Sequence, residues 1–79
     1  MKVKYYSIKD VKANEFGDLL FAKNDQVAKR IFGQVMSNNP ILSADMQLYY
    51  IGEFDNESGS FSAEFVPVVV VDNAVESEE

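Results

Sequence analysis

The chain has 79 residues, a length typical of one domain, and its aromatic residues (six Phe and four Tyr) can fill a small core. It has no cysteine and no histidine, which excludes disulfides and thiolate metal sites and removes the commonest general base. The formal net charge is −6, yet all seven cations lie between Lys2 and Arg30, and residues 31–79 carry nine carboxylates and no cation. This asymmetry indicates a basic face, an acidic tail or both, with chance segregation as the plain alternative.

The N-terminus shows no sign of a targeting segment. Met1–Lys4 lacks the apolar run of a signal peptide, and the longest unbroken apolar stretch is far shorter than a membrane span. We therefore expect a cytoplasmic protein with no membrane contact.

The first predicted element is a strand over Val3–Lys9, which is rich in aromatic and β-branched residues. Alternation places Tyr6 and Ile8 on one face, and Tyr5 and Ser7 on the other. Because both faces carry an aromatic side chain, we expect a central strand in a sheet that is covered on one face and functional on the other.

A connection over Asp10–Asp18 follows, with Gly17 at its turn, and leads into a short strand over Leu19–Ala22. The one helix is predicted over Asn24–Ser37. Its apolar residues recur at helical spacing and form a face that packs on the sheet: Val27, Ala28, Ile31, Phe32, Val35 and Met36.

The helix has start and stop signals at both ends. Asn24 or Asp25 caps its N-terminus, because a short side-chain acceptor satisfies the free N–H groups there. The segment Ser37–Pro40 ends it, through an asparagine in the left-handed conformation followed by a proline that cannot continue the helix.

A β-hairpin organises the second half of the chain. Two alternating runs, Met46–Phe54 and Ser60–Val66, flank the polar loop Asp55–Gly59. Gly59 suits the positive φ at which such loops commonly end.

Two features complicate this hairpin and its continuation. Alternation groups Phe54 with Leu48 and Tyr50, unless a bulge at Gly52 swaps the faces. The run Val68–Val71 is strongly β-prone and follows a proline, so we expect it at a sheet edge or paired with a partner chain.

These elements predict an α+β fold, a small antiparallel sheet of about four strands with one helix across a face, in the order β-β-α-β-β. Residues 1–71 form its single domain, and residues 72–79 form an acidic, disordered tail. A tail that competes with phosphate for the cations would make nucleic-acid binding switchable.

The residues offer little for catalysis. The serines have no histidine to activate them, no phosphate-binding loop is present, and hairpin carboxylates such as Glu53 and Asp55 are more often solvated than catalytic. We therefore expect no enzymatic activity, no cofactor and no metal site.

Binding of single-stranded nucleic acid has a better physical basis, because such sites combine cations along the backbone with aromatic side chains on which bases stack. The candidate phosphate contacts are Lys2, Lys4, Lys9, Lys12, Lys29 and Arg30, and the candidate stacking residues are Tyr5 and Tyr49. The alternative is equally compatible with the pattern: half-buried sheet tyrosines, and lysines that keep the strand edges soluble.

Four fragments stand in a distinctive order: Tyr6–Ala13, Phe21–Lys23, Ala28–Phe32 and Ile51–Asp55, the last followed by Ser58 and Gly59. Together they resemble the small nonstructural DNA-binding protein of gokushoviruses, which are phages of the Microviridae with single-stranded DNA genomes. The resemblance spans residues 5 to about 61. It implies a nonstructural counterpart of the microvirus packaging protein, located in the host cytoplasm.

The resemblance implies a non-enzymatic accessory protein that binds single-stranded viral DNA during genome replication and packaging. The alternative is a protein-interaction adaptor that contacts the replication initiator or the procapsid without touching DNA. A homodimer is expected in either case, because a four-stranded sheet of this size leaves apolar edges and one face to cover.

Overall fold

The structure is a computed structural model and describes residues 1–41 and 43–72, except the side chains of residues 43 and 65. Its elements are β1 (Lys2–Asp10), β2 (Glu15–Ala22), α1 (Asp25–Asn38), a short 3-10 helix η1 (Ser43–Asp45), β3 (Met46–Asp55) and β4 (Phe61–Asp72). The strands form one antiparallel sheet in the order β2-β1-β3-β4. The predicted α+β class and element order are confirmed.

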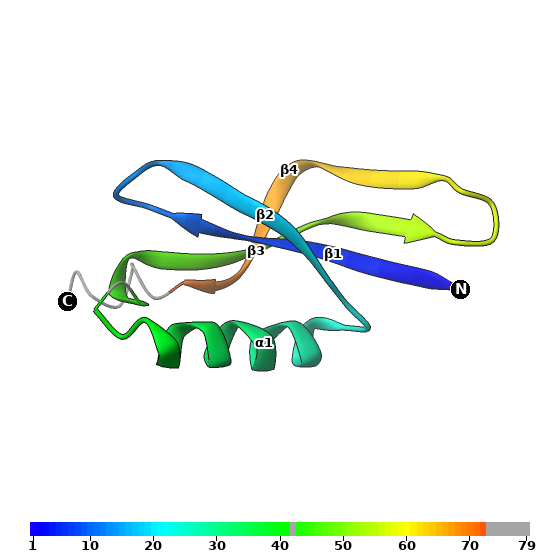
Figure 1. Ribbon diagram of the computed structural model, residues 1–79. Coiled ribbons are helices and arrows are strands. Elements are labelled where there is room, and N and C mark those ends of the chain that lie inside the picture. Colours follow the sequence, from blue (N-terminus) through cyan, green and yellow to red (C-terminus); the bar gives the residue numbers. More distant parts are fainter. Residues whose placement is uncertain (42, 73–79) are drawn as a thin grey trace.

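The helix lies along one side of the sheet, and the β3–β4 hairpin projects beyond its first turn (Figure 1). The core sits between α1 and the two central strands. Tyr6 of β1 and Leu48 of β3 are fully buried there, and Ala28 and Phe32 of α1 pack against them. The Tyr6 hydroxyl donates a hydrogen bond to Asp25 at the start of α1, which ties the helix N-terminus to β1.

Both helix ends use asparagine, in different ways. Asn24 is the N-cap, and its side-chain oxygen accepts from the Val27 N–H at 3.0 Å. The left-handed cap predicted at the other end is wrong, because Asn39 has φ −137°. Its backbone N–H donates to the Met36 carbonyl and its side-chain amide to the Val35 carbonyl, so two free carbonyls are satisfied without a left-handed residue.

The first turn is shorter than predicted. Strand β2 begins at Glu15, so residues 11–14 make the turn, and Asn14 rather than Gly17 takes the left-handed conformation, with φ 57°. Asparagine tolerates this region better than other side chains. Gly17 lies within β2 where the pairing with β1 shifts register, and a Cβ there would stand 3.3 Å from the Ile8 carbonyl oxygen.

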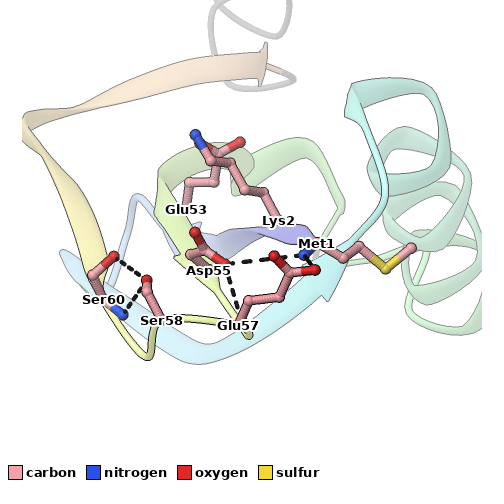
Figure 2. Close-up of polar contacts among 7 residues, drawn as sticks. All are labelled: Met1, Lys2, Glu53, Asp55, Glu57, Ser58 and Ser60. Atoms are coloured by element: carbon pink, nitrogen blue, oxygen red, sulfur yellow. Dashed lines mark hydrogen bonds and ion pairs between the residues drawn. The ribbon is translucent and has the colours of Figure 1, made fainter.

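The predicted hairpin is confirmed, with Gly59 at φ 80°. Figure 2 shows how its loop is held. The Asp55 carboxylate accepts from the Glu57 backbone N–H at 2.9 Å, and the Met1 amine lies 3.2 Å from Glu57 and 3.9 Å from Asp55. The Glu57 N–H is the main cause of a lowered pKa at Asp55, helped by Ser58 and the N-terminal charge.

A bulge in β3 swaps its faces. Tyr50 stands opposite Tyr6, whereas Gly52 stands opposite Tyr5, so Ile51 is the extra residue. The swap foreseen at Gly52 therefore occurs beside it. Phe54 falls on the side of Tyr5, away from the helix.

Strand β4 pairs with β3 in two segments. Phe61–Ala63 pairs near the hairpin loop, and Val68–Asp72 pairs farther along the strand. Between these segments the register shifts across residues 64–67, which include Pro67. The valine run lies on a sheet edge, as expected. Asp72, which was assigned to the predicted tail, is the last residue of β4. The rest of the predicted tail, residues 73–79, lies outside the described part.

Candidate nucleic-acid interface

The side of the sheet opposite α1 has no element over it within the described residues, and we call it the open face. Side chains opposite one another on paired strands point to the same side, so the register assigns its members. They are Val3, Tyr5, Ser7 and Lys9 of β1, Phe16, Leu19 and Phe21 of β2, Gln47, Tyr49, Gly52 and Phe54 of β3, and Phe61, Ala63, Val69 and Asp72 of β4.

One aromatic cluster lies at the end of the open face near the β1–β2 turn. The rings of Phe16 and Tyr49 meet edge to face with centroids 5.2 Å apart, and the Lys9 ammonium lies 5.4 Å from the Phe16 centroid. Phe16 remains 43% exposed. A cation held beside a solvent-facing ring is the pairing that single-stranded nucleic acid requires.

A second cluster lies toward the hairpin. The Tyr5 ring is 6.1 Å from Phe21 and 5.7 Å from Phe61, centroid to centroid. Gly52 leaves space for the Phe61 ring, because a Cβ at this position would stand 2.9 Å from that ring and 2.6 Å from the Ser62 carbonyl oxygen. Phe61 therefore covers a glycine, whereas Phe21 is 65% exposed and free to take a ligand.

Charge is distributed unevenly between the two sides of the sheet. Among the open-face positions of β1, β2 and β3, Lys9 is the one charged residue. Carboxylates gather on the other side, where Asp25 meets Tyr6 and Glu53 meets Lys2. Asp72 stands opposite Gln47, so the register places this carboxylate at the β4 edge of the open face. An anionic chain therefore meets little repulsion across most of the aromatic surface.

The structure brings together three of the predicted site residues, Tyr5, Lys9 and Tyr49, all on the open face. Lys12 lies in the exposed turn beside them. The other cations lie elsewhere. Lys2 is 4.0 Å from Glu53 on the opposite side, and the remaining three, Lys4, Lys29 and Arg30, also lie away from the open face, on the helix side of β1 and on α1.

Lys4 and Lys29 line a cleft of about 360 Å³ between α1 and the projecting part of the sheet. The cleft also contains Asp25 and Tyr50. Burial raises the pKa of the Tyr50 phenol, and the charges of Glu53, Glu64 and Asp25 raise it further. Acidic groups thus offset the two lysines, which makes this cleft a weaker place for phosphate than the open face.

Sequence reasoning missed three aromatic rings of the open face, Phe16, Phe21 and Phe61, because Phe16 was assigned to a connection and no register was available. The alternation of Leu19 and Phe21 along β2 was the available signal. It also missed Lys23, which joins Lys2 and Phe21 around a hollow of about 300 Å³ at the far corner of the sheet.

The described residues contain neither a metal-binding cluster nor a membrane-spanning helix. No group of three or more Asp and Glu side chains is arranged to hold a metal ion. No helix in that part of the chain is long and apolar enough to cross a membrane.

The fold and this surface define a class: a small α+β protein with a helix on one side of a four-stranded antiparallel sheet and an aromatic face on the other. Residues 3–77 match the family described as Phage ORF5 protein, and the chain belongs to that family. The expected phage origin is thereby confirmed. No curated protein and no solved structure matches the chain.

Proposed function

We propose that this phage protein binds single-stranded viral DNA through its open face and acts, without enzymatic activity, in genome replication and packaging. The observation that carries the proposal is the aromatic surface of β1, β2 and β3, which bears one lysine and no carboxylate. The resemblance to the gokushovirus DNA-binding protein, also from phages, supports the same reading.

The two aromatic clusters suggest how a strand would lie. Bases stack on Phe16 and Tyr49 at one end and on Phe21 and Tyr5 at the other. Each stacked base contributes roughly 1–3 kcal/mol and requires no particular sequence. A base pair inside a duplex presents no free ring face to such a surface, so single strands are preferred.

The phosphates then follow the cations at both ends. Lys9 and Lys12 lie beside the first cluster, and Lys23 lines a corner hollow with Phe21 of the second cluster and with Lys2 of the helix side. With about four phosphates contacted, log K falls with log salt at a slope near −3 for single strands. Lys4, Lys29 and Arg30 are reached only by a longer strand that passes round the sheet.

The test is fluorescence anisotropy of a labelled single-stranded oligonucleotide, titrated at low and at physiological salt. We expect Phe16→Ala/Phe21→Ala to weaken binding by about 10-fold or more, and Lys9→Gln to weaken it and reduce the salt slope by about 0.7. Lys29→Gln is the matched control, since it removes the same charge on the helix side. Absence of binding at low salt, or equal losses from Lys9→Gln and Lys29→Gln, would overturn the open-face assignment.

The adaptor remains a second candidate because of one observation, the exposed β4 edge. Val68 and Val69 are 47% and 49% exposed, and an edge strand presents unpaired backbone groups to a partner strand. Such pairing with the replication initiator or the procapsid would depend little on salt. Val68→Lys would abolish it and leave DNA binding largely intact, because Val68 stands opposite Tyr50 on the helix side of β4. Copurification with each partner would show the loss.

We also propose that the chain forms a homodimer, with either the β4 edge or the open face as the contact. Sedimentation equilibrium distinguishes these contacts. Val68→Lys, on the helix side of β4, dissociates an edge dimer, whereas Phe21→Asp dissociates a dimer formed through the open face. A monomer at all concentrations would contradict the proposal. A dimer through the open face would compete with DNA, and added oligonucleotide would then dissociate it.

A further inference from the structure

A hollow of about 300 Å³, the corner hollow, lies at the end of the sheet where β1 begins and β2 ends. Its walls are aliphatic or aromatic except for two lysine side chains. They are formed by Met1, Lys2, Val3, Phe21, Ala22 and Lys23. The volume lies at the lower end of the range for small-molecule sites, which suits one nucleotide better than a larger ligand.

The walls of the corner hollow are held by contacts that lie outside it. The Met1 carbonyl accepts from the Asn56 backbone N–H at 3.1 Å, and the Met1 amine lies 3.2 Å from Glu57. The Met1 side chain extends away from these contacts (Figure 2). Ala22 is 4% exposed and packs in the core, which fixes the end of β2. The hollow is therefore formed before a ligand enters it.

Phe21 gives the corner hollow a surface for stacking. Its ring is 65% exposed, and its contact with the Tyr5 ring is tilted by 47° at a centroid distance of 6.1 Å. A tilted contact leaves a face of the phenyl ring uncovered, and a flat nucleobase can stack on that face.

The two lysines of the corner hollow belong to different parts of the sheet. Lys23 directly follows β2 and makes no ion pair with any described residue. Lys2 belongs to the helix side, where its ammonium lies 4.0 Å from Glu53 in an exposed and therefore weak pair. Among the residues that the structure describes, no carboxylate lines this hollow, whereas Asp25 lines the cleft beside α1. The corner hollow thus combines an apolar wall with uncompensated positive charge.

We propose that the corner hollow binds one nucleotide of a single-stranded DNA chain, with its base on Phe21 and its two flanking phosphates at Lys23 and Lys2. The inference rests on the function proposed above and adds a defined subsite to it. Each nucleotide within a strand lies between two singly charged phosphodiesters, so two cations around one hollow match its charge. Stacking elsewhere on the open face does not fix the position of a base, whereas this subsite holds the strand at one nucleotide.

The first measurement uses thymidine with a phosphate on each of its two hydroxyls, which represents one nucleotide with both flanking phosphates. Titration of the full chain, followed by NMR of the backbone amides, should shift the resonances of Val3, Phe21 and Lys23. We expect thymidine monophosphate to bind about threefold or more weakly, because it engages one lysine instead of two. Thymidine and inorganic phosphate, each tested alone, should give no saturable shifts at these residues.

Matched variants compare the corner hollow with the aromatic cluster at the other end of the open face. Lys23→Gln and Phe21→Leu should each weaken binding of the thymidine bisphosphate by about threefold to tenfold. The controls Lys12→Gln and Phe16→Leu make the same changes beside the other cluster, and should alter that affinity by less than about twofold. Phe16 and Phe21 are both exposed, so leucine at either position leaves the core intact.

Three results would overturn the subsite: no shift at the corner hollow, shifts that centre on Phe16 and Lys9, or equal shifts with inorganic phosphate alone. In each case, a labelled oligonucleotide that still binds the protein, and binds Phe16→Leu more weakly, leaves the proposed function standing. Failure of every oligonucleotide to bind overturns that function. If the thymidine bisphosphate nevertheless fills the hollow, the site takes free nucleotides, and the strand subsite proposed here falls as well.

Discussion

The two faces of the sheet are built from the same four strands and differ in cover, in charge and in the exposure of their aromatic side chains. On the helix side, Tyr6 and Leu48 are fully buried under α1. On the open face, the neighbouring positions along the same strands carry Tyr5 and Tyr49, and β2 leaves Phe21 exposed to 65%. Adjacent residues thus enter opposite environments, as the two-residue period of a strand requires.

The comparison separates side chains that stabilise the fold by burial from side chains that lie exposed on the sheet. A helix of 14 residues covers only part of one face, yet that face alone supplies the core cluster. The open face carries a comparable aromatic content with no cover among the described elements. A large exposed apolar surface marks an interaction site more often than it serves stability, and the predictions below test that division.

The largest difference in stability should appear when the same leucine-to-alanine truncation is made on each of the two faces. Leu48→Ala empties a fully buried site and should lower the free energy of unfolding by about 2–5 kcal/mol. Leu19→Ala makes the same truncation at a residue that is 56% exposed on the open face, and should cost well under about 1 kcal/mol. Urea unfolding followed by circular dichroism measures both. Similar costs would mean that another chain or segment buries the open face in solution.

Gly52→Ala tests whether the fold needs a gap in the open face. The added Cβ would stand 2.6 Å from a backbone oxygen and 2.9 Å from the Phe61 ring, so β3 and β4 must separate. We expect a loss of about 1–3 kcal/mol in thermal unfolding, with weaker DNA binding. Gly33→Ala, whose Cβ would meet nothing within 4 Å in α1, should instead stabilise by up to about 1 kcal/mol. A neutral Gly52→Ala would show that Phe61 does not rest on this glycine.

The sequence predicted the two faces of β1 from local alternation. It predicted the existence of the hairpin from the residues of its turn. Tyr5 and Tyr6 lie on opposite faces of the sheet, as predicted, and Gly59 has the predicted positive φ. The face of Phe54 was not predictable, since one extra residue at Ile51 reverses the alternation and only pairing with β1 reveals which residue is extra.

The candidate site was predicted in part. Lys9 and Tyr49 lie on one face because β1 and β3 pair. The sequence suggested only that the strand with Tyr49 could be the neighbour of the strand with Lys9. Lys4 and Lys29 were grouped with them by charge alone. Alternation placed Lys4 on the side of Tyr6, and the helical period placed Lys29 on the solvent side of the helix. The sequence did not show which face of the sheet the helix covers, so it did not separate these two lysines from the open face.

Tyr6→Phe tests the covered face through the hydrogen bond that Tyr6 donates to Asp25 of α1. Burial raises the pKa of the Tyr6 phenol, and its hydrogen bond to Asp25 raises it further. The folded state therefore disfavours the phenolate, so stability is fully present below the unfolded pKa of about 10 and is lost as pH rises above it. Tyr6→Phe should lower the free energy of unfolding by about 1 kcal/mol at pH 7. Above pH 10 the stability of this variant should fall less steeply than that of the parent chain.

The measurement is chemical denaturation between pH 7 and pH 11. Tyr49→Phe is the matched control on the open face, where the hydroxyl donates to Gln47 on its own strand. Parallel alkaline losses in the parent chain and in Tyr6→Phe would contradict a buried phenol as the cause.

Asp55→Asn should have the smallest effect on stability. The effect should be confined to the projecting β3–β4 hairpin, which lies outside the core under α1. The Glu57 N–H, followed by contacts from Ser58 and the N-terminal charge, lowers the pKa of this carboxyl. A lowered pKa contributes stability above the unfolded value near 4, and that contribution is lost as pH falls through the folded value. Asp55→Asn should therefore remove part of the acid sensitivity of the hairpin amides, measured by NMR between pH 2 and pH 6. If the Asp55 carboxyl itself titrates at the ordinary aspartate value, the loop does not hold its ionised form, and the projecting hairpin owes its order to the strand pairing alone.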